Sequence, residues 1–134
     1  MRKKIKIESN QASLRIVENA IDEATLELGI TQDSYGKILV SALEAVNNAI
    51  LHGNKMDPGK SVRFEIEYIK EELKIIVADE GSGFRPEEVP DPTLPQNIEM
   101  CNGRGVYLMR HLADDIKYSR KGNTVTMTFK NIKS

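Results

Sequence analysis

Hydrophobic and polar positions follow two regular spacings along most of the chain. Strict alternation, which is typical of strands with one buried face, predicts strands at residues 3–9, 62–69, 73–79, 116–119 and 124–129. Hydrophobic residues recur every three to four positions, as in amphipathic helices, in segments 11–28, 33–52 and 105–115. This order predicts an α+β fold, a two-layer α/β sandwich with one mixed, mostly antiparallel sheet and its helices on one face.

The connection between residues 80 and 102 has neither spacing. It contains four of the five prolines of the chain and several acidic residues beside them. Long irregular connections inside compact domains are usually functional. We therefore expect this segment to belong to a binding site.

The helix predicted at residues 33–52 carries unusual polar residues. At about 100° per residue, the predicted core stripe contains Leu39, Ala42, Leu43, Val46 and Ile50, and the opposite side carries Lys37, Ser41, Glu44 and Asn48. Glu44 is the only charged residue from Ile38 to Leu51, and Asn48 lies one turn further along the same patch. A solvated helix face is the common explanation of a polar stripe, but such a face normally carries charges at most turns. We interpret the patch as the wall of a cavity.

Two glycine-containing stretches carry further candidate chemistry. Asp79 ends a hydrophobic strand and is followed by Gly81 and Gly83, which let the backbone turn and a ligand approach closely. Gly103 and Gly105 precede a helix, whose free N–H groups suit a phosphate. Taken alone, the first stretch is more commonly a plain acidic turn and the second an ordinary capped loop. Neither is a P-loop or a dinucleotide fingerprint.

Composition and charge restrict the classes of protein to which this chain can belong. A length of 134 residues with 40% hydrophobic content suits one domain, residues 1–134. A net charge of -1 without a basic block argues against a dedicated nucleic-acid or membrane-surface binder. The hydrophobic runs are too short to span a bilayer, and a single cysteine, Cys101, forms no internal disulfide. These features predict a cytoplasmic protein.

Together and in this order, the stretches "EAVNNAILHGN", "DEGSGF" and "GRGVYLM" resemble the N, G1 and G2 boxes of the GHKL ATPases, which share the Bergerat ATP-binding fold. The resemblance covers about residues 5–130. The short chain and the form of the first stretch look most like the bacterial anti-sigma-factor serine/threonine protein kinases. The resemblance implies a protein that binds ATP with Mg²⁺, phosphorylates an anti-anti-sigma protein and alternatively holds a sigma factor inactive.

The resemblance also implies roles for individual residues. Glu44 matches the general base, Asn48 the magnesium ligand, and Asp79 the carboxylate that accepts a hydrogen bond from the adenine amino group. Gly81 and Gly83 would let the purine approach.

Other matching positions would surround the rest of the nucleotide. Gly103, Gly105 and the backbone from Val106 onward match the phosphate-contacting loop, and Thr124 matches a threonine that helps to hold adenine. Arg104 either reaches the terminal phosphates or lies at the surface. Residues 85–102 correspond to the ATP lid.

Three functions fit these residues. The first is a kinase, the second an ATP-gated binding module that sequesters a sigma factor or another partner, and the third a stand-alone histidine-kinase-like catalytic domain. The presence of both Glu44 and Asn48 favours the kinase. Relatives commonly form homodimers, although the sequence shows no interface signature.

Overall fold

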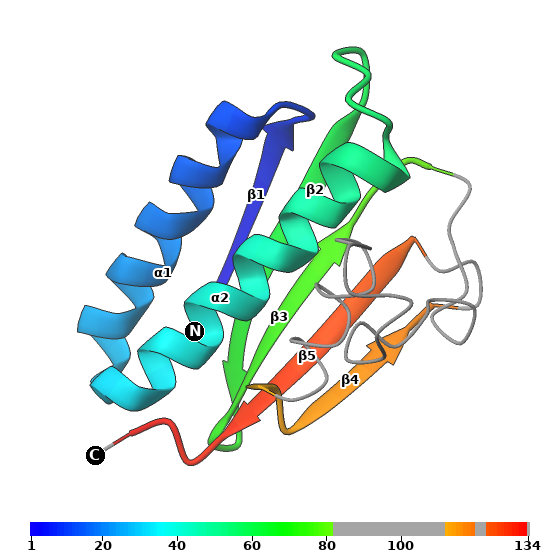
Figure 1. Ribbon diagram of the computed structural model, residues 1–134. Coiled ribbons are helices and arrows are strands. Elements are labelled where there is room, and N and C mark those ends of the chain that lie inside the picture. Colours follow the sequence, from blue (N-terminus) through cyan, green and yellow to red (C-terminus); the bar gives the residue numbers. More distant parts are fainter. Residues whose placement is uncertain (82–111, 120–122, 134) are drawn as a thin grey trace, which may run out of the picture.

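A five-stranded antiparallel sheet forms one layer of the protein (Figure 1). The computed structural model describes residues 1–81, 112–119 and 123–133. Its strands are β1 (Arg2–Glu8), β2 (Ser61–Ile69), β3 (Glu72–Ala78), β4 (Asp115–Tyr118) and β5 (Thr124–Lys130), in the spatial order β1-β2-β3-β5-β4. Each neighbouring pair is antiparallel, so the described part of the sheet is wholly antiparallel rather than mixed. The α+β class is confirmed.

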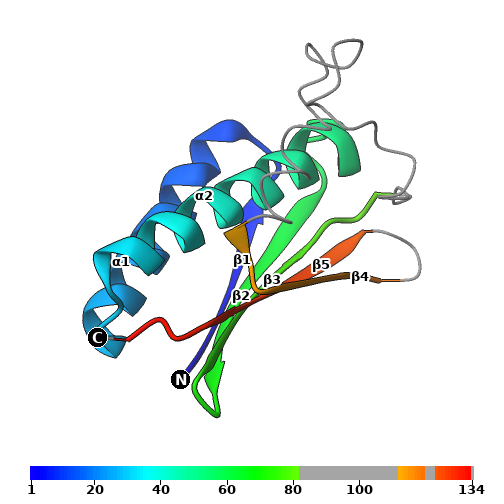
Figure 2. The same ribbon diagram turned by 60° about the horizontal axis from the view of Figure 1, so that its bottom comes forward.

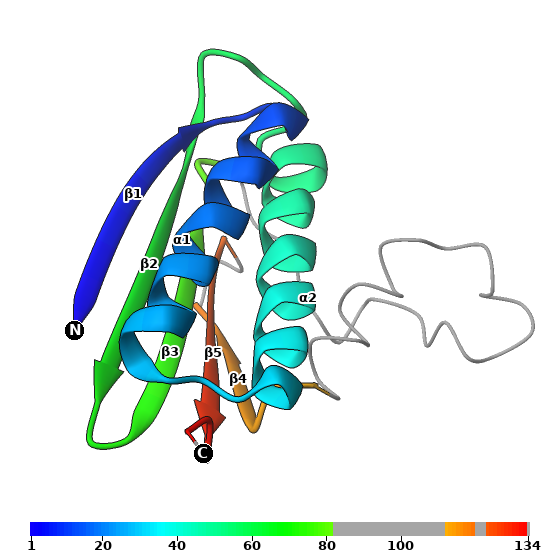
Figure 3. The same cartoon turned by 90° about the vertical axis from the view of Figure 1, so that its left-hand side faces the viewer.

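Two helices, α1 (Leu14–Leu28) and α2 (Gln32–Asn48), lie side by side over one face of this sheet (Figures 2 and 3). A short 3₁₀ turn, Gln11–Ser13, precedes α1, and the Asn10 side chain caps it by accepting a hydrogen bond from the Ser13 N–H. This cap explains why α1 begins three residues later than predicted. Gly29 ends α1 at φ 68°, a conformation that favours glycine, so the predicted end of this helix at residue 28 is confirmed.

The helices and the sheet bury a common hydrophobic core. Its largest fully buried side chains are Val17, Ile21, Ile38, Val46, Ile50, Phe64, Ile66, Leu73, Ile75, Met127 and Ile132. In β2 and over most of β3, inward residues alternate with exposed or half-buried ones, which is the pattern that the sequence predicts for a sheet covered on one face.

The buried face of α2 differs from the predicted stripe. Ile38, Ala45 and Ala49 join the core, whereas Leu43 is only partly buried at its margin. Ser41, predicted on the polar side, is 0% exposed. Ala42, Val46 and Ile50 of the predicted stripe are fully buried, and Leu39, like Leu43, packs against the core while only partly buried. The predicted stripe was too narrow, because α2 contacts both α1 and β3 and buries a wider face than contact with one layer would require.

This correction gives a test of the helix faces. Ile38→Ala is expected to lower the free energy of unfolding by about 2–5 kcal/mol, because it empties a fully buried position. Leu43→Ala is expected to lower it by less than about 2 kcal/mol, because part of that side chain already faces solvent. Urea unfolding of both variants measures the difference. Equal losses would contradict the observed orientation of α2.

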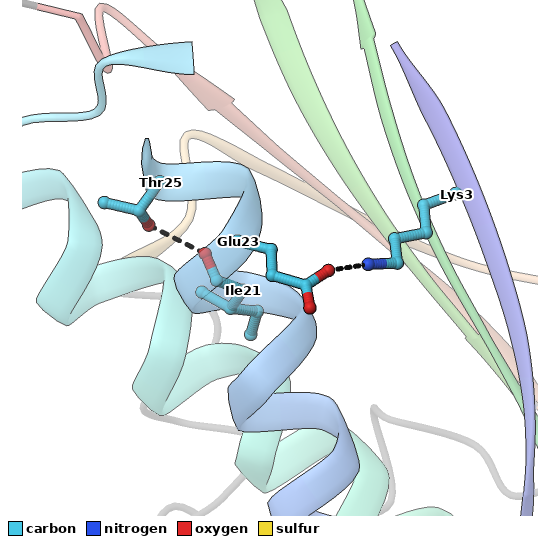
Figure 4. Close-up of polar contacts among 4 residues, drawn as sticks. All are labelled: Lys3, Ile21, Glu23 and Thr25. Carbon is cyan, nitrogen blue, oxygen red and sulfur yellow. Dashed lines mark hydrogen bonds and ion pairs between the residues drawn. The ribbon is translucent and has the colours of Figure 1, made fainter. Parts of the chain in front are cut away.

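A polar contact also joins the two layers at the edge of the sheet (Figure 4). Lys3 on β1 forms an ion pair with Glu23 on α1, while the nearby Thr25 hydroxyl donates to the Ile21 carbonyl, 2.8 Å away in its own helix. Both charged side chains are substantially exposed, and pairs of this kind typically contribute about 0–1 kcal/mol. The hydrophobic core, rather than this pair, holds the layers together.

Several predicted elements lie wholly or partly outside the described residues. They include the irregular connection beyond residue 81 and the predicted helix from 105 as far as residue 111. That helix was predicted to extend through residue 115, but Asp115 instead begins β4.

Candidate functional site

The C-terminal end of α2 carries the two polar side chains that the sequence singled out. Glu44 and Asn48 are both half-buried. Glu44 forms no hydrogen bond or ion pair with the described residues. The Nδ2 atom of Asn48 is buried and has no hydrogen-bond partner there. A buried amide without a partner is costly in a folded protein, so this side chain indicates a binding site for a polar ligand.

The helix continues into an unusual turn directly after Asn48. Residues Ala49–Gly53 form a π-helical turn, which closes with a 2.8 Å hydrogen bond from the Asn54 N–H to the Ala49 carbonyl. Turns of this kind are rare and occur frequently at functional sites. It places Gly53 at the end of β3, where Asp79 lies.

Asp79 follows the last residue of β3, and its backbone is held by Asn123, the residue before β5. The Asp79 N–H donates to the Asn123 carbonyl at 2.9 Å, and the Asn123 Nδ2 donates to the Asp79 carbonyl at 3.3 Å. In the side chain, Oδ1 accepts a hydrogen bond from the Gly81 N–H at 2.7 Å. The other oxygen, Oδ2, accepts no hydrogen bond from the described residues.

Burial changes the acidity of this carboxyl group. Removal from water raises the pKa of Asp79 above its ordinary value, while the Gly81 N–H and the positive charge of Lys60 act in the opposite direction. Desolvation is the largest of these effects. The site therefore holds a carboxylate that gains from a new hydrogen-bond donor more than an exposed carboxylate would.

Two glycines allow the end of α2 to approach Asp79. A Cβ atom added to Gly53 would lie 2.2 Å from Asp79 Oδ2, and one added to Gly81 would lie 2.0 Å from the Gly53 carbonyl oxygen. Any other residue at either position would force these segments apart. Gly81 thus permits contact between protein segments. Its contact with a purine stays a prediction. Gly53, which follows the helix predicted at residues 33–52, is the second glycine of this contact.

Asn54 was also missed as a member of this site. The side chain is 1% exposed and connects three elements: Nδ2 donates to the Ser61 carbonyl at 2.9 Å, and Oδ1 accepts from the Glu80 N–H at 2.8 Å. The sequence offers no more signal than an asparagine at the end of a helix, because Ser61 and Glu80 are 7 and 26 residues away.

Thr124 forms no hydrogen bond with the Asp79 side chain within the described residues. It pairs with Ala78 on the face of the sheet opposite to the helices, where it lines a hollow of about 350 Å³ with Lys4, Lys6, Arg63 and Ile76, among others. The residue that contacts the Asp79 segment is Asn123, one position earlier. Successive side chains of a strand point to opposite faces, so a shift of one residue moves the side chain to the other face.

The remaining predicted site residues are outside the described part of the chain. They are Gly83, Gly103, Arg104, Gly105 and Val106, together with the predicted lid at 85–102. In the residues that are described, no group of three or more His, Cys, Asp or Glu side chains is arranged to hold a metal ion. No helix in the same ranges is long and apolar enough to cross a membrane.

The described residues fit a nucleotide carrying a base with an amino group. Asp79 offers a desolvated carboxylate oxygen without a partner among the described residues, and Asn48 offers an unpaired N–H donor and, on the same amide, an oxygen. An amide oxygen is a suitable ligand for Mg²⁺, which in nucleotide sites is typically held by one or two protein groups together with phosphates. The fold and these two groups together define a candidate nucleotide-binding domain.

Comparison with known proteins identifies the family. Residues 7–129 match the histidine kinase-like ATPase domain, and the chain belongs to this family. It is 28% identical over 133 residues to the serine-protein kinase RsbW of Bacillus subtilis, covering 92% of this chain and 82% of that protein. It is 32% identical over 135 residues to RsbW of Bacillus velezensis, with the same coverage. The anti-sigma F factor of Oceanobacillus iheyensis is 28% identical over 127 residues, which are 91% of this chain and 85% of that protein.

A solved structure supports the fold. The crystal structure of the RsbU and RsbW domains of a Mycobacterium tuberculosis protein superposes with a TM-score of 0.66 at 18% sequence identity. The match covers 97% of this chain and 32% of that longer chain. The resemblance to GHKL proteins and the predicted Bergerat-type fold are therefore confirmed, and family membership implies that the nucleotide is ATP.

Proposed function

We propose that this protein is an ATP-dependent serine/threonine protein kinase that phosphorylates a small regulatory protein of the anti-anti-sigma type. The observation that carries the proposal is the contact between Gly53 and the Asp79 carboxylate. This contact joins the helix bearing Glu44 and Asn48 to a hydrogen-bond acceptor suited to adenine. The serine-protein kinases among the relatives support the same activity.

Each of three side chains has a separate role in this proposal. Asp79 Oδ2 accepts a hydrogen bond from the adenine amino group, and the Asn48 amide oxygen helps to hold Mg²⁺. Bound Mg²⁺-ATP supplies the transferable phosphoryl group. Glu44, on the same patch of α2 as Asn48, accepts the proton of the attacking serine hydroxyl.

Residues beyond the described ranges complete the proposed site. Gly103, Gly105 and the backbone at Val106 would contact the phosphates, with Arg104 reaching the terminal ones. Gly83 would give the base room, and residues 85–102 would form the lid. These assignments rest on the match of the sequence motifs alone.

The proposed partners and location follow from the named relatives. Serine-protein kinases and anti-sigma F factors are both similar to this chain. An anti-anti-sigma protein is therefore the proposed phosphoacceptor, and a sigma factor is the proposed second partner. The protein would act in the cytoplasm, and homodimerisation is proposed from its common occurrence among relatives.

A second candidate function is an ATP-gated binding module that sequesters its partner without transferring phosphate. The observation in its favour is the similarity to anti-sigma F factors, whose name describes binding to a sigma factor. A pull-down from the native cell with ATP or ADP, followed by mapping of phosphorylated serines on the captured proteins, distinguishes the two. A captured partner phosphorylated in an ATP-dependent manner supports the kinase.

Thermal unfolding tests the nucleotide assignment itself. At free Mg²⁺-ATP about 100 times its Kd, binding should stabilise the folded protein by about 2.7 kcal/mol. For a domain of this size, that should raise the Tm by roughly 10 °C. GTP at the same concentration should give a clearly smaller shift, because its base presents a carbonyl where adenine has the amino group. Equal shifts with ATP and GTP would contradict a role for Asp79 in recognising adenine.

A further inference from the structure

The geometry points to Asn54 as a positioning residue for nucleotide selectivity. We infer that it fixes the Asp79 segment against the end of α2 and thereby sets the preference of the site for a purine with a 6-amino group. This inference rests on the proposed function, because it assumes that the Asp79 carboxylate receives the base.

The buried Asn54 amide supplies a donor and an acceptor at the same point. Nδ2 donates to the Ser61 carbonyl at the start of β2, and Oδ1 accepts from the Glu80 N–H directly after Asp79. An amide offers both functions in one small planar group, whereas an ionised carboxylate lacks the donor. The side chain thus joins the π-helical turn after α2 to the start of β2 and to the segment after β3.

Asp79 lies between two anchors. On the β5 side, Asn123 binds its backbone N–H and carbonyl. On the α2 side, Asn54 binds the N–H of the next residue, Glu80. Gly53, the residue before Asn54, lies directly against the carboxylate. A change at Asn54 is therefore expected to shift the Asp79 carboxylate in two ways. It releases the backbone directly after Asp79, and it disturbs Gly53, which lies against the carboxylate.

The same anchor relates the base-binding carboxylate to the residues on α2. The Asn54 backbone N–H closes the π-helical turn that follows Asn48, and its side chain binds the Glu80 N–H, so one residue holds both the helix end and the Asp79 segment. Only the side-chain contact is lost in Asn54→Ala. Binding sites generally need their polar groups to be fixed within about 0.5 Å. Loss of the Asn54 side chain should consequently weaken the hydrogen bond between Asp79 and the base amino group. Nucleotide contacts that do not involve Asp79 should weaken less.

Two nucleotides provide the test: ATP and purine riboside triphosphate, which lacks the 6-amino group. Wild-type protein should bind ATP about 10- to 100-fold more tightly than the analogue, as expected for a charge-assisted hydrogen bond to a partly buried carboxylate. Asn54→Ala should lose most of this ratio, leaving it below about threefold, while its affinity for the analogue changes little. Isothermal titration with Mg²⁺ present measures both affinities.

Glu80→Ala is the matched control, because Glu80, like Asn54, contacts Ser61. It removes the carboxylate that binds the Ser61 N–H and hydroxyl, but it leaves the Glu80 backbone N–H on Asn54. The Tm of this variant should fall while its ratio of affinities stays at the wild-type value. If Asn54→Ala does not fold, Asn54→Ser replaces it, because the shorter side chain cannot bridge Ser61 and Glu80.

The outcomes separate the inference from the proposed function. A wild-type protein that binds ATP and the analogue equally would overturn the assignment of Asp79 to adenine. A wild-type protein that discriminates, together with an Asn54 variant that discriminates equally well, would overturn the positioning role alone. If both the Asn54 and the Glu80 variants lose the ratio of affinities for ATP and the analogue, the whole contact region around Ser61 has been loosened. That result would also reject a specific role for Asn54.

Discussion

Glu44→Gln is expected to slow phosphate transfer to the protein partner at least ~100-fold, because a general base typically contributes about 10²–10⁴-fold to rate. The substitution is nearly isosteric and removes only the proton-accepting carboxylate. Glu44 forms no hydrogen bond or ion pair with the described residues, so the fold should not depend on its charge. ATP affinity is therefore expected to stay within a few-fold of wild type, since positioning of the nucleotide relies on other groups.

Measurement of ATP affinity and partner phosphorylation on the same preparation decides the role of Glu44. Asp33→Asn is a suitable control, because Asp33 is an exposed acidic residue in the first turn of the same helix. It should retain wild-type transfer. Wild-type transfer by Glu44→Gln would remove Glu44 from the mechanism. If the protein captures its partner differently with ATP than with ADP but never transfers phosphate, it is instead the binding module.

Asp79→Asn is expected to have opposite effects on nucleotide binding and on stability. ATP affinity should fall roughly 10- to 100-fold, as expected when a charge-assisted hydrogen bond is weakened. The nucleotide-free protein should become more stable near neutral pH, because burial raises the pKa of Asp79 and so disfavours its ionised form in the folded state. The asparagine keeps an oxygen that can accept from the Gly81 N–H.

The sign of the pH dependence follows from the raised pKa. The contribution of Asp79 to wild-type stability is most favourable below pH 3.8, which is the ordinary pKa of this group. The contribution is lost as the pH rises through the higher pKa of the folded protein. The advantage of Asp79→Asn in urea unfolding should therefore shrink as pH falls toward 3.8. An advantage that stays constant over this range would contradict desolvation as its cause.

Glu80→Gln provides a control with the opposite sign. Hydrogen bonds from the Ser61 backbone and hydroxyl lower the pKa of Glu80, so its ionised form is favoured in the folded protein. Its contribution is present above the ordinary value of 4.5 and is lost as pH falls through the lower folded value. Glu80→Gln should thus lower stability near neutral pH, and the loss should diminish in acid.

The elements of the fold were predictable from local spacing. β2 and β3 alternate because each has one face against the helices, and α1 ends where Gly29 adopts a left-handed conformation. Such features depend on residues close in the chain. The orientation of α2 was predicted less well, because hydrophobic spacing does not show that Ser41 is also buried.

The candidate site was predictable only in part, for a related reason. The sequence indicated Glu44, Asn48 and Asp79 as polar residues in otherwise hydrophobic surroundings. It could not show that Asn123 rather than Thr124 contacts the Asp79 segment, because that depends on the register between β3 and β5. The role of Asn54 likewise depends on partners that only the folded chain brings near.

The position of β5 in the sheet affects when the site can form during folding. β5 pairs with β3, and the Asp79 segment is held by Asn123, 44 residues later in the chain. Contacts of such long sequence separation slow folding, since much of the chain must be ordered before they are made. A nascent chain that has not yet released residue 123 from the ribosome cannot hold Asp79 in this way. Nucleotide would bind only after this late step, and it would therefore slow unfolding more than it would speed folding.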